Sequence, residues 1–166
     1  RAALTGHLVF STLHTNDAIG GISRLTDMGV EPFLVSASVR AFLAQRLVRR
    51  LCPSCKVPTE YSREYLDSVG APADLIGEIY VAKDEGCDRC RNSGYLGRLA
   101  IYEVCLVTPA IEELIVGGAS SAEIKAKAIE EGFVPMRDYG WHKVMSGDTT
   151  IEEVLAATTV ELKADI

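Results

Sequence analysis

The sequence contains no long apolar run. None of its hydrophobic stretches approaches the roughly 20 consecutive residues that cross a bilayer, so it predicts no membrane-spanning helix. Positive charge is also scarce, because 17 Lys and Arg stand against 23 Asp and Glu and give a net charge of −6. An acidic chain has no overall attraction to nucleic acid, and we therefore expect no nucleic-acid partner.

Several catalytic signatures are missing as well. The phosphate-binding pattern G-x-x-x-x-G-K-[ST] does not occur, and neither a Ser-His-Asp order nor a cysteine nucleophile can be recognised. The first residue is Arg1 instead of Met, and the first residues resemble the end of a helix that runs into a strand. We therefore expect part of a longer protein, for which the lack of a signal peptide says nothing about the compartment.

The composition is sufficient for a folded core. Of the 166 residues, 48% are hydrophobic, which suits one domain of ordinary size or a larger lobe with an appendage. Such a composition excludes wholesale disorder.

Cysteines give the strongest local signal. Four of the five cysteines form two C-x-x-C pairs, separated by residues 56–86: Cys52, Cys55, Cys87 and Cys90. Four thiolates make the tetrahedral shell that zinc prefers and leave no open position, so the pattern indicates a structural zinc site and not a catalytic one. Disulfides and free thiols are the alternatives, although an odd cysteine count favours metal binding in a reducing compartment. The fifth, Cys105, lies in an apolar stretch and is expected to be a core residue.

The first 51 residues read as strand and helix in succession. Residues 6–14 are almost continuously apolar, which predicts a strand buried on both faces of a parallel sheet. Residues 15–17 supply helix-capping side chains, and apolar residues at a spacing of three predict a helix that ends at Gly29. A second helix is expected from Pro32 to Leu43, and a strand over residues 45–51.

The remaining sequence predicts an insert and a helical lobe. Residues 52–97 are polar and rich in Pro and Gly, with a short helical pattern over 63–69, and residues 98–107 form a returning strand. Residues 108–160 are expected to be a helical subdomain, followed by a frayed tail over 161–166. Its helices are expected over residues 108–116, 120–131, 136–145 and 150–157, with Gly residues ending the first three.

A second candidate site lies where the first strand meets its helix. His14 and the residues around it would lie at the carboxyl end of a strand, beside a helix N-terminus that can bind an anion. The alternative is that Thr15 or Asn16 only caps the helix and His14 packs beside it. Arg46, Arg49, Arg50 and Arg98 could contact phosphates or a neighbouring subunit, or they could form a solvated strand face.

Together these motifs resemble one known family. Residues 5–18, TGHLVFSTLHTNDA, look like the His box of bacterial type II secretion and type IV pilus assembly ATPases. The similarity extends over nearly the whole chain, through RLTDMG (24–29), PFL (32–34), AQRLVR (44–49), LCPSCK (51–56), GCDRCRNSGYLGR (86–98), IYE (101–103) and GDTTIEEVL (147–155).

The resemblance implies an α/β fold in which residues 1–51 belong to the C-terminal part of a RecA-like ATPase core. His7 and His14 would be the catalytic His-box histidines near the γ-phosphate or an adjoining interface, and Thr12 and Thr15 would lie beside the nucleotide. The Walker A loop, acidic Asp box and Walker B motif would precede Arg1, so we expect no ATP hydrolysis by this chain alone.

The family further implies ATP and Mg²⁺ as ligands, with zinc in the cysteine insert, and a homo-hexamer at the cytoplasmic face of the bacterial inner membrane. Its partners there would be the platform proteins of a secretion or pilus machine. The cysteine insert favours the assembly or secretion branch over pilus retraction. Two other classes remain as alternatives: a zinc-stabilised interaction module without a nucleotide role, and a zinc-ribbon nucleic-acid binder.

Overall fold

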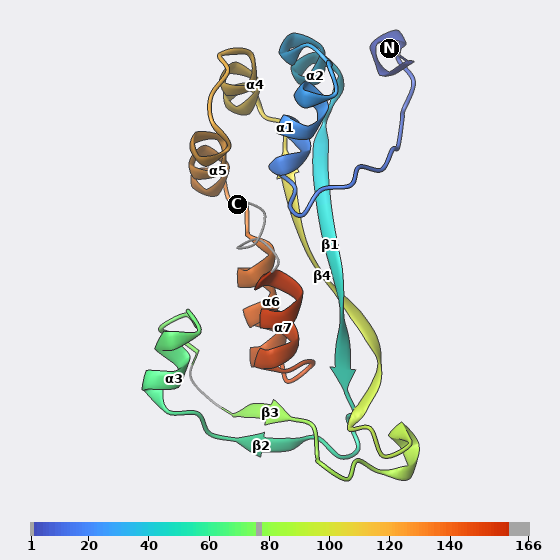
Figure 1. Ribbon diagram of the computed structural model, residues 1–166, viewed down its shortest axis with the longest axis vertical. Coiled ribbons are helices and arrows are strands. Elements are labelled where there is room, and N and C mark those ends of the chain that lie inside the picture. Colours follow the sequence, from blue (N-terminus) through green and yellow to red (C-terminus); the bar gives the residue numbers. More distant parts are fainter. Residues whose placement is uncertain (1, 76–77, 160–166) are drawn as a thin grey trace. The chain divides into compact units, whose positions relative to one another are not determined.

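The computed structural model describes residues 2–75 and 78–159, which fold into two compact units. The first unit comprises Arg1–Ala44 and Glu103–Val134, and the second comprises Gln45–Tyr102 and Pro135–Ile166. Helices and strands are both present, as expected for an α/β chain (Figure 1). No helix among the described residues has the length and apolar character needed to span a membrane.

Short helices dominate the first unit. They are the 3-10 helix η1 (Ala2–Thr5) and the α-helices α1 (Gly20–Asp27), α2 (Pro32–Ser38), α4 (Pro109–Val116) and α5 (Ser121–Glu130). Local sequence explains their starts: Thr108 accepts a hydrogen bond from the Ile111 N–H and so caps α4, and Ser120 forms a capping box with Glu123 at α5. The buried residues of α2, α4 and α5 make the helical part of the core: Val35, Ile111, Ile115, Ile124 and Ala128.

Two long strands run through both units. β1 (Ala41–Leu51) and β4 (Tyr95–Leu106) form a two-stranded sheet. In the first unit, Phe42 of β1 is buried against α1, where a Cβ at Gly21 would lie only 2.6 Å from the Phe42 ring. Gly21 therefore permits the close approach of α1 to this strand.

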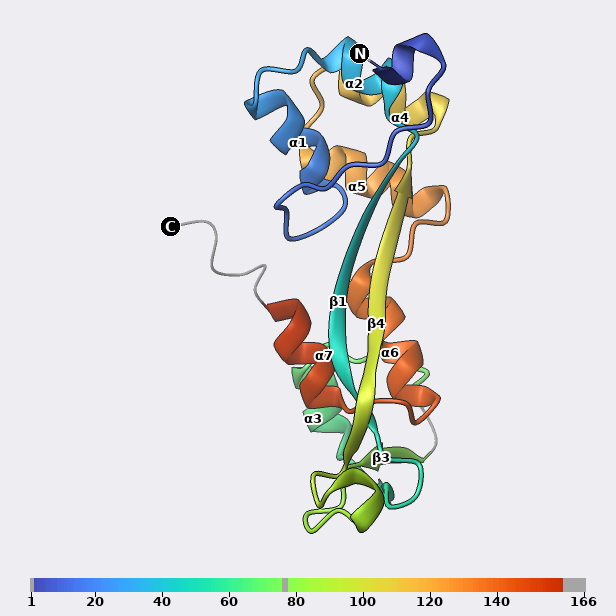
Figure 2. The same cartoon turned by 90° about the vertical axis from the view of Figure 1, so that its right-hand side faces the viewer.

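The second unit contains a smaller sheet and a pair of helices. β2 (Val57–Thr59) pairs antiparallel with β3 (Ile79–Val81), so that Pro58 lies opposite Tyr80. The helices are α3 (Arg63–Ser68), α6 (Met136–Met145) and α7 (Ile151–Thr158), with the 3-10 helix η2 (Asp88–Cys90) (Figure 2). Their core consists of Trp141, Val144, Ile151 and Val154 together with Leu66, Ala71, Leu75 and Ile79.

The turn between α6 and α7 is hydrogen-bonded to the end of β1. The Leu51 N–H donates to the Asp148 carbonyl at 2.9 Å, and the Thr149 hydroxyl donates to the Arg49 carbonyl at 2.8 Å. The Arg49 guanidinium also donates two hydrogen bonds to the Glu153 Oε1, from Nη2 at 2.6 Å and from Nε at 2.8 Å. Backbone and side-chain contacts thus anchor this helix pair beside the first cysteine pair.

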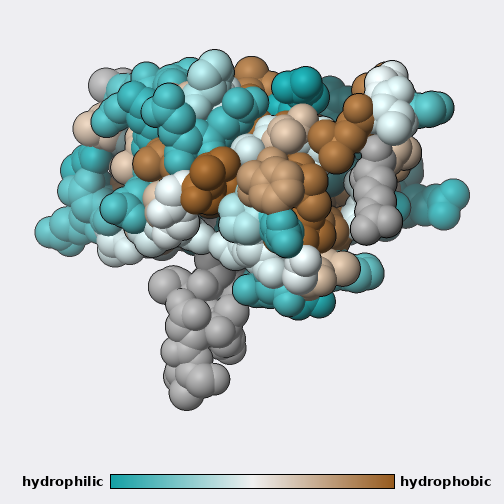
Figure 3. Space-filling view, turned by 90° about the horizontal axis from the view of Figure 1, so that it is seen from above, coloured by the Kyte–Doolittle hydropathy of each residue, from teal (hydrophilic) through white to brown (hydrophobic). Residues whose placement is uncertain are grey.

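The prediction of a buried strand over residues 6–14 was wrong. The segment has no regular secondary structure, and Leu8 and Phe10 are 83% and 89% exposed. A strand requires a hydrogen-bonded partner, and in the described residues the pairs are β1 with β4 and β2 with β3. These side chains are among several exposed apolar residues of the first unit, and Figure 3 shows one face of the molecule on which apolar side chains gather within a polar rim.

Two helix boundaries and one strand pairing also differ from the sequence-based prediction. The helix expected over 32–43 ends at Ser38, because Phe42 and Leu43 belong to β1, where pairing with β4 outweighs local helical spacing. The helix expected to be capped by residues 15–17 begins only at Gly20. The pairing of β2 with β3 was not foreseen, since each strand has only three residues. The four helices of residues 108–158 were predicted closely, and the tail over 161–166 lies outside the described residues.

Candidate metal centre and the His14 segment

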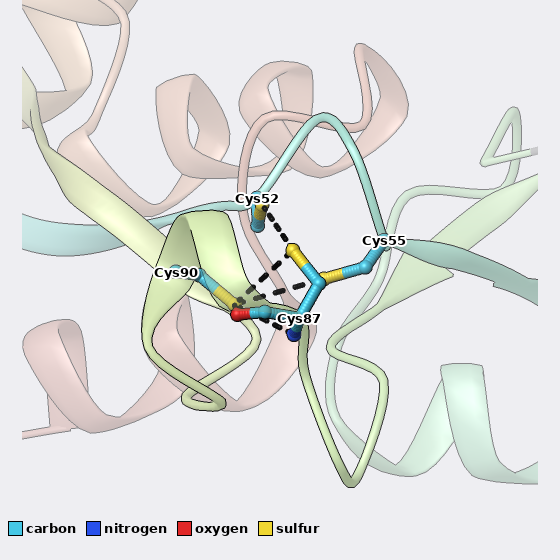
Figure 4. A group of neighbouring side chains, drawn as sticks. All are labelled: Cys52, Cys55, Cys87 and Cys90. Carbon is cyan, nitrogen blue, oxygen red and sulfur yellow. Dashed lines mark hydrogen bonds between the residues drawn. The ribbon is translucent and has the colours of Figure 1, made fainter.

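The two cysteine pairs meet at one point in the second unit. Cys52 directly follows β1 and Cys55 lies one turn later, while Cys87 directly precedes η2 and Cys90 is its last residue. All four Sγ atoms lie within 4.8 Å of one another (Figure 4). The Cys52–Cys87 and Cys55–Cys90 sulfur distances are both 3.8 Å, and the Cys87–Cys90 distance is 3.7 Å.

These distances fit a tetrahedral metal. Sulfurs bound at about 2.3 Å from one tetrahedral zinc lie roughly 3.8 Å from each other, whereas a disulfide requires about 2.05 Å. All five cysteines are free thiols, and Cys52 and Cys90 are buried. The four cysteines could therefore hold a metal ion, and no coordination position would be left open.

Tight backbone turns aim the sulfurs inward. The N–H groups of Cys55 and Lys56 both donate to the Cys52 carbonyl. At the second pair the chain crosses itself so closely that a Cβ on Gly86 would lie 2.4 Å from the backbone carbon of Asn92. Gly86 also has φ +55°, a conformation that glycine adopts without strain. Glycine is thus required for the second turn to close.

Backbone N–H groups favour the thiolate at Cys90. The Cys87 N–H donates to the Cys90 Sγ at 3.1 Å, and the Gly94 N–H donates to the same atom at 3.3 Å. Burial by itself would raise the pKa of Cys90, but these hydrogen bonds outweigh it and lower the pKa to about 6. The thiolate is the metal-binding form of cysteine, so the surroundings of Cys90 suit a metal ligand.

Cys55 shows the opposite effect. Burial, followed by hydrogen bonds with the neighbouring thiols, raises the pKa of Cys55 to about 12. Several thiolates in one small space repel each other, and a divalent cation among them would favour their deprotonated forms. The cluster is therefore electrostatically suited to a bound cation.

The residues of the predicted nucleotide site lie on the irregular segment before α1, in the first unit. His7, Thr12 and His14 are exposed, and Thr15 is partly buried. The Thr5 hydroxyl lies 3.0 Å from the His7 Nδ1 atom, a hydrogen-bonding distance. These side chains are accessible to a ligand or to another protein surface.

The backbone at the start of α1 is already hydrogen-bonded within the protein. The Ala18 N–H donates to the Glu103 Oε1 at 2.7 Å, and the Gly20 N–H donates to the Asp17 Oδ1 at 2.6 Å. Asp17 therefore supplies a side-chain oxygen at this helix start. Two of the N–H groups at this helix start are therefore taken by carboxylates and are less available to an anion.

Glu103 was missed as a site residue. It is a buried carboxylate on β4, only 4% exposed, and its backbone hydrogen-bond partner is 85 residues away in the sequence. The available signal was a single charged residue inside the apolar stretch 101–107. A buried charge must be hydrogen-bonded to be tolerated, which makes such a residue worth noting in any apolar strand.

Two arginines of β1 contact acidic groups of the protein itself. Arg49 pairs with Glu153, and the Arg50 guanidinium lies 3.8 Å from the Asp148 carboxylate. Arg49 also lies over the Tyr95 ring, 4.0 Å from its centroid. Both arginine side chains are therefore solvent-exposed and form ion pairs within the protein.

The chain belongs to the type II/IV secretion system proteins, whose family model matches residues 1–156 and so covers both the His14 segment and the cysteine cluster. The family resemblance drawn from the sequence motifs is thereby confirmed. The chain is 52% identical over 159 residues to the type IV pilus assembly ATPase PilB of Myxococcus xanthus, covering 95% of this chain and 28% of that protein.

Two other relatives represent the pilus assembly and the type II secretion branches of the family. The PilB of Thermus thermophilus is 48% identical over 157 residues, covering 95% of this chain and 18% of the relative. The type II secretion system ATPase E of Vibrio cholerae is 46% identical over 158 residues, covering 95% and 31%. The chain therefore spans less than a third of the length of these relatives.

Proposed function

We propose that this chain is the C-terminal portion of an ATPase that couples ATP hydrolysis to type II protein secretion or type IV pilus assembly. The observation that carries the proposal is the 52% identity to a pilus assembly ATPase across 95% of the chain. Similar identity to a type II secretion ATPase leaves both machines as candidates.

In this proposal His14 and His7 act at the γ-phosphate or at an adjoining subunit interface, and Thr12 and Thr15 contact the nucleotide. The exposure of His7, Thr12 and His14 supports this role, because exposed side chains are available to a ligand. ATP and Mg²⁺ would be bound chiefly by parts of the protein outside this sequence, which has no G-x-x-x-x-G-K-[ST] loop. The chain alone would then be inactive.

Zinc would be the metal of the cysteine cluster, in a structural role. Four thiolates at tetrahedral spacing match zinc, and a shell made entirely of protein ligands leaves no position for a substrate or water. The metal would hold the end of β1 beside the start of β4 and stabilise the insert over 52–97. Residues 1–51 and 98–107 would belong to a RecA-like core, and 108–160 to a helical subdomain.

We further propose that the whole protein works as a homo-hexamer at the cytoplasmic face of the inner membrane, against the platform proteins of the machine. Changes between nucleotide states would then move neighbouring subunits and do mechanical work on these partners. The names of the relatives, which are pilus assembly and secretion ATPases, support this assignment.

Replacing His14 in the full-length protein tests the nucleotide role. We expect His14→Ala to lower ATP turnover by about tenfold or more, as for the loss of a group that acts only in the transition state. His142→Ala is the matched control, because His142 is exposed on α6 in the second unit. Undiminished ATP turnover and secretion in His14→Ala would contradict the proposal. Robust Mg²⁺-dependent turnover by the isolated 166-residue chain would contradict its expected inactivity.

A zinc-stabilised protein-interaction module without a nucleotide role is the second candidate. The engagement of the Ala18 and Gly20 N–H groups by Glu103 and Asp17 favours it, because these groups are then less available to a phosphate. The His14→Ala experiment separates the two candidates. Unchanged ATP turnover would support the interaction module.

A further inference from the structure

We propose that Glu103 is a positioning residue that fixes the His14 segment for its role in ATP hydrolysis. The inference rests on the proposed function of His14 and adds a residue from a distant part of the chain. Its basis is the 2.7 Å hydrogen bond from the Ala18 N–H to the Glu103 Oε1.

The burial of Glu103 protects this hydrogen bond from competition with water. The residue is 4% exposed, and a carboxylate removed from water is tolerated only where donors satisfy it. Ala18 is buried beside it, at 2% exposure. Because both groups are enclosed, water cannot easily replace either partner, and the hydrogen bond holds one backbone position of the segment against β4.

The position held is close to His14 along the chain. Ala18 follows His14 by four positions, and a fully extended chain advances at most about 3.6 Å per residue. The His14 Cα must therefore lie within roughly 14 Å of the point that Glu103 fixes. On the other side, the Asp17 Oδ1 accepts the Gly20 N–H at 2.6 Å and sets the direction in which the chain enters α1. The segment that carries His14 is thus anchored at one end by two carboxylates.

A positioning role differs from a purely structural one in its kinetics. If Glu103 only stabilised the fold, its loss would lower the folded fraction and leave the kcat of folded protein unchanged. If it positions His14, its loss lowers kcat in folded protein, since misplacement of a reacting group by about 1 Å can cost up to about a hundredfold in rate. The KM for MgATP should change much less, because the nucleotide is chiefly bound elsewhere.

The test uses the full-length ATPase with Glu103→Ala, Glu103→Gln and the double variant Glu103→Ala/His14→Ala. We expect Glu103→Ala to lower kcat by about tenfold or more, and Glu103→Gln to retain most of the activity, since its amide oxygen can still accept the Ala18 N–H. The double variant should be no slower than His14→Ala alone, because both changes remove the same contribution.

Glu131→Gln is the matched control. The Glu131 carboxylate accepts the Thr108 hydroxyl at 2.6 Å at the start of α4 in the same unit, and its loss should leave kcat unchanged. Thermal unfolding of every variant gives the folded fraction used to correct kcat. Should Glu103→Ala fail to fold, Glu103→Asp carries the test, because its shorter side chain moves the acceptor away from Ala18.

Each outcome decides a different statement. Unchanged turnover in His14→Ala overturns the proposed nucleotide role and this inference with it. Reduced turnover in His14→Ala, combined with wild-type kcat in folded Glu103→Ala or Glu103→Asp, overturns the positioning role alone. Multiplicative effects in the double variant also overturn it, because they would show that the two residues act independently.

Discussion

The ammonium group of Lys56 donates a hydrogen bond of 2.8 Å to the Gly147 carbonyl oxygen and lies 4.4 Å from the centroid of the Tyr80 ring. Lys56 directly follows Cys55, so a residue next to the cysteine cluster is hydrogen-bonded to the turn between α6 and α7. The Leu51 N–H reaches the same turn from the other side of Cys52, at the Asp148 carbonyl. The order of the cysteine cluster and the order of this turn should therefore depend on each other.

Removal of the metal should loosen the turn. We expect amide hydrogen exchange at Leu51 and Lys56 to accelerate by about tenfold or more after chelation, because an opening that is easier by about 1.4 kcal/mol changes exchange tenfold. Exchange measured by NMR or mass spectrometry checks this. The Gly117 amide, which donates to the Glu113 carbonyl in the first unit, serves as the internal control. Equal protection at Leu51 with and without chelator would refute the coupling.

Metal content should depend on the cluster and not on Cys105. We expect about one zinc per chain, a large loss of zinc in Cys55→Ser, and full retention in Cys105→Ser, because Cys105 is buried in the first unit. Elemental analysis after dialysis against a competing chelator measures this. Equal loss in both variants, or iron in place of zinc, would contradict the assignment.

Gly140 should be irreplaceable in the packing of α6 on α7. An added Cβ would lie 2.5 Å from the Val154 Cγ1. Overpacking of this kind costs roughly 1–3 kcal/mol, whereas replacing Gly by Ala in a helix gains about 0.5–1 kcal/mol. We expect Gly140→Ala to lower the free energy of unfolding, as measured by urea denaturation.

The companion variant Val154→Ala identifies the cause of this loss. It removes the methyl group that the new Cβ would strike, so the double variant should be destabilised by less than the sum of the two single changes. Simple additivity would mean that the clash is not the reason.

Glu153 should make stability depend on pH in the acid range. Burial by itself would raise the pKa of Glu153, but hydrogen bonds and charge attraction from Arg49 lower it below the usual 4.5. A lowered pKa stabilises the fold above the unfolded-state pKa, and this contribution is lost as the pH falls through the folded-state value. Because the Arg49 side chain is 59% exposed, the contribution should be no more than about 1 kcal/mol.

The measurement compares wild type with Glu153→Gln in urea at several pH values. We expect a constant gap between pH 8 and 6 that narrows below about pH 5. Glu113→Gln, which removes an exposed carboxylate on α4, controls for the change in net charge. A gap that widens in acid would contradict the assigned direction.

The four helices of residues 108–158 were predictable because their boundaries carry local signals. Thr108, Ser120 and Thr150 each accept a backbone N–H three residues later, as their positions before apolar stretches had indicated. The cysteine cluster was equally readable, since tight C-x-x-C turns aim two sulfurs at one point whatever surrounds them. The contacts that form each helix start and each C-x-x-C turn lie within a few residues of each other.

The remaining features depend on distant partners. A continuous apolar run over residues 6–14 indicates an affinity for burial, but only a neighbouring strand can turn it into β-structure. The end of α2 at Ser38 depends on β4, which pairs with β1 far along the chain. The partnership of Glu103 with Ala18 spans 85 residues. No local spacing encodes such a contact, so these features became visible only in three dimensions.

The distance between the cysteine pairs along the chain bears on how the protein folds. Cys52 and Cys87 are 35 residues apart, and holding the ends of such a loop together costs about 4 kcal/mol of chain entropy. If a metal binds both cysteine pairs early in folding, its binding energy offsets this loop-closure entropy before β1 and β4 pair. Chains synthesised under zinc limitation should then pair these strands late and leave strand residues that are buried in the folded protein, such as Val48, open to aggregation. Zinc supply during synthesis would in this way set the yield of the folded protein.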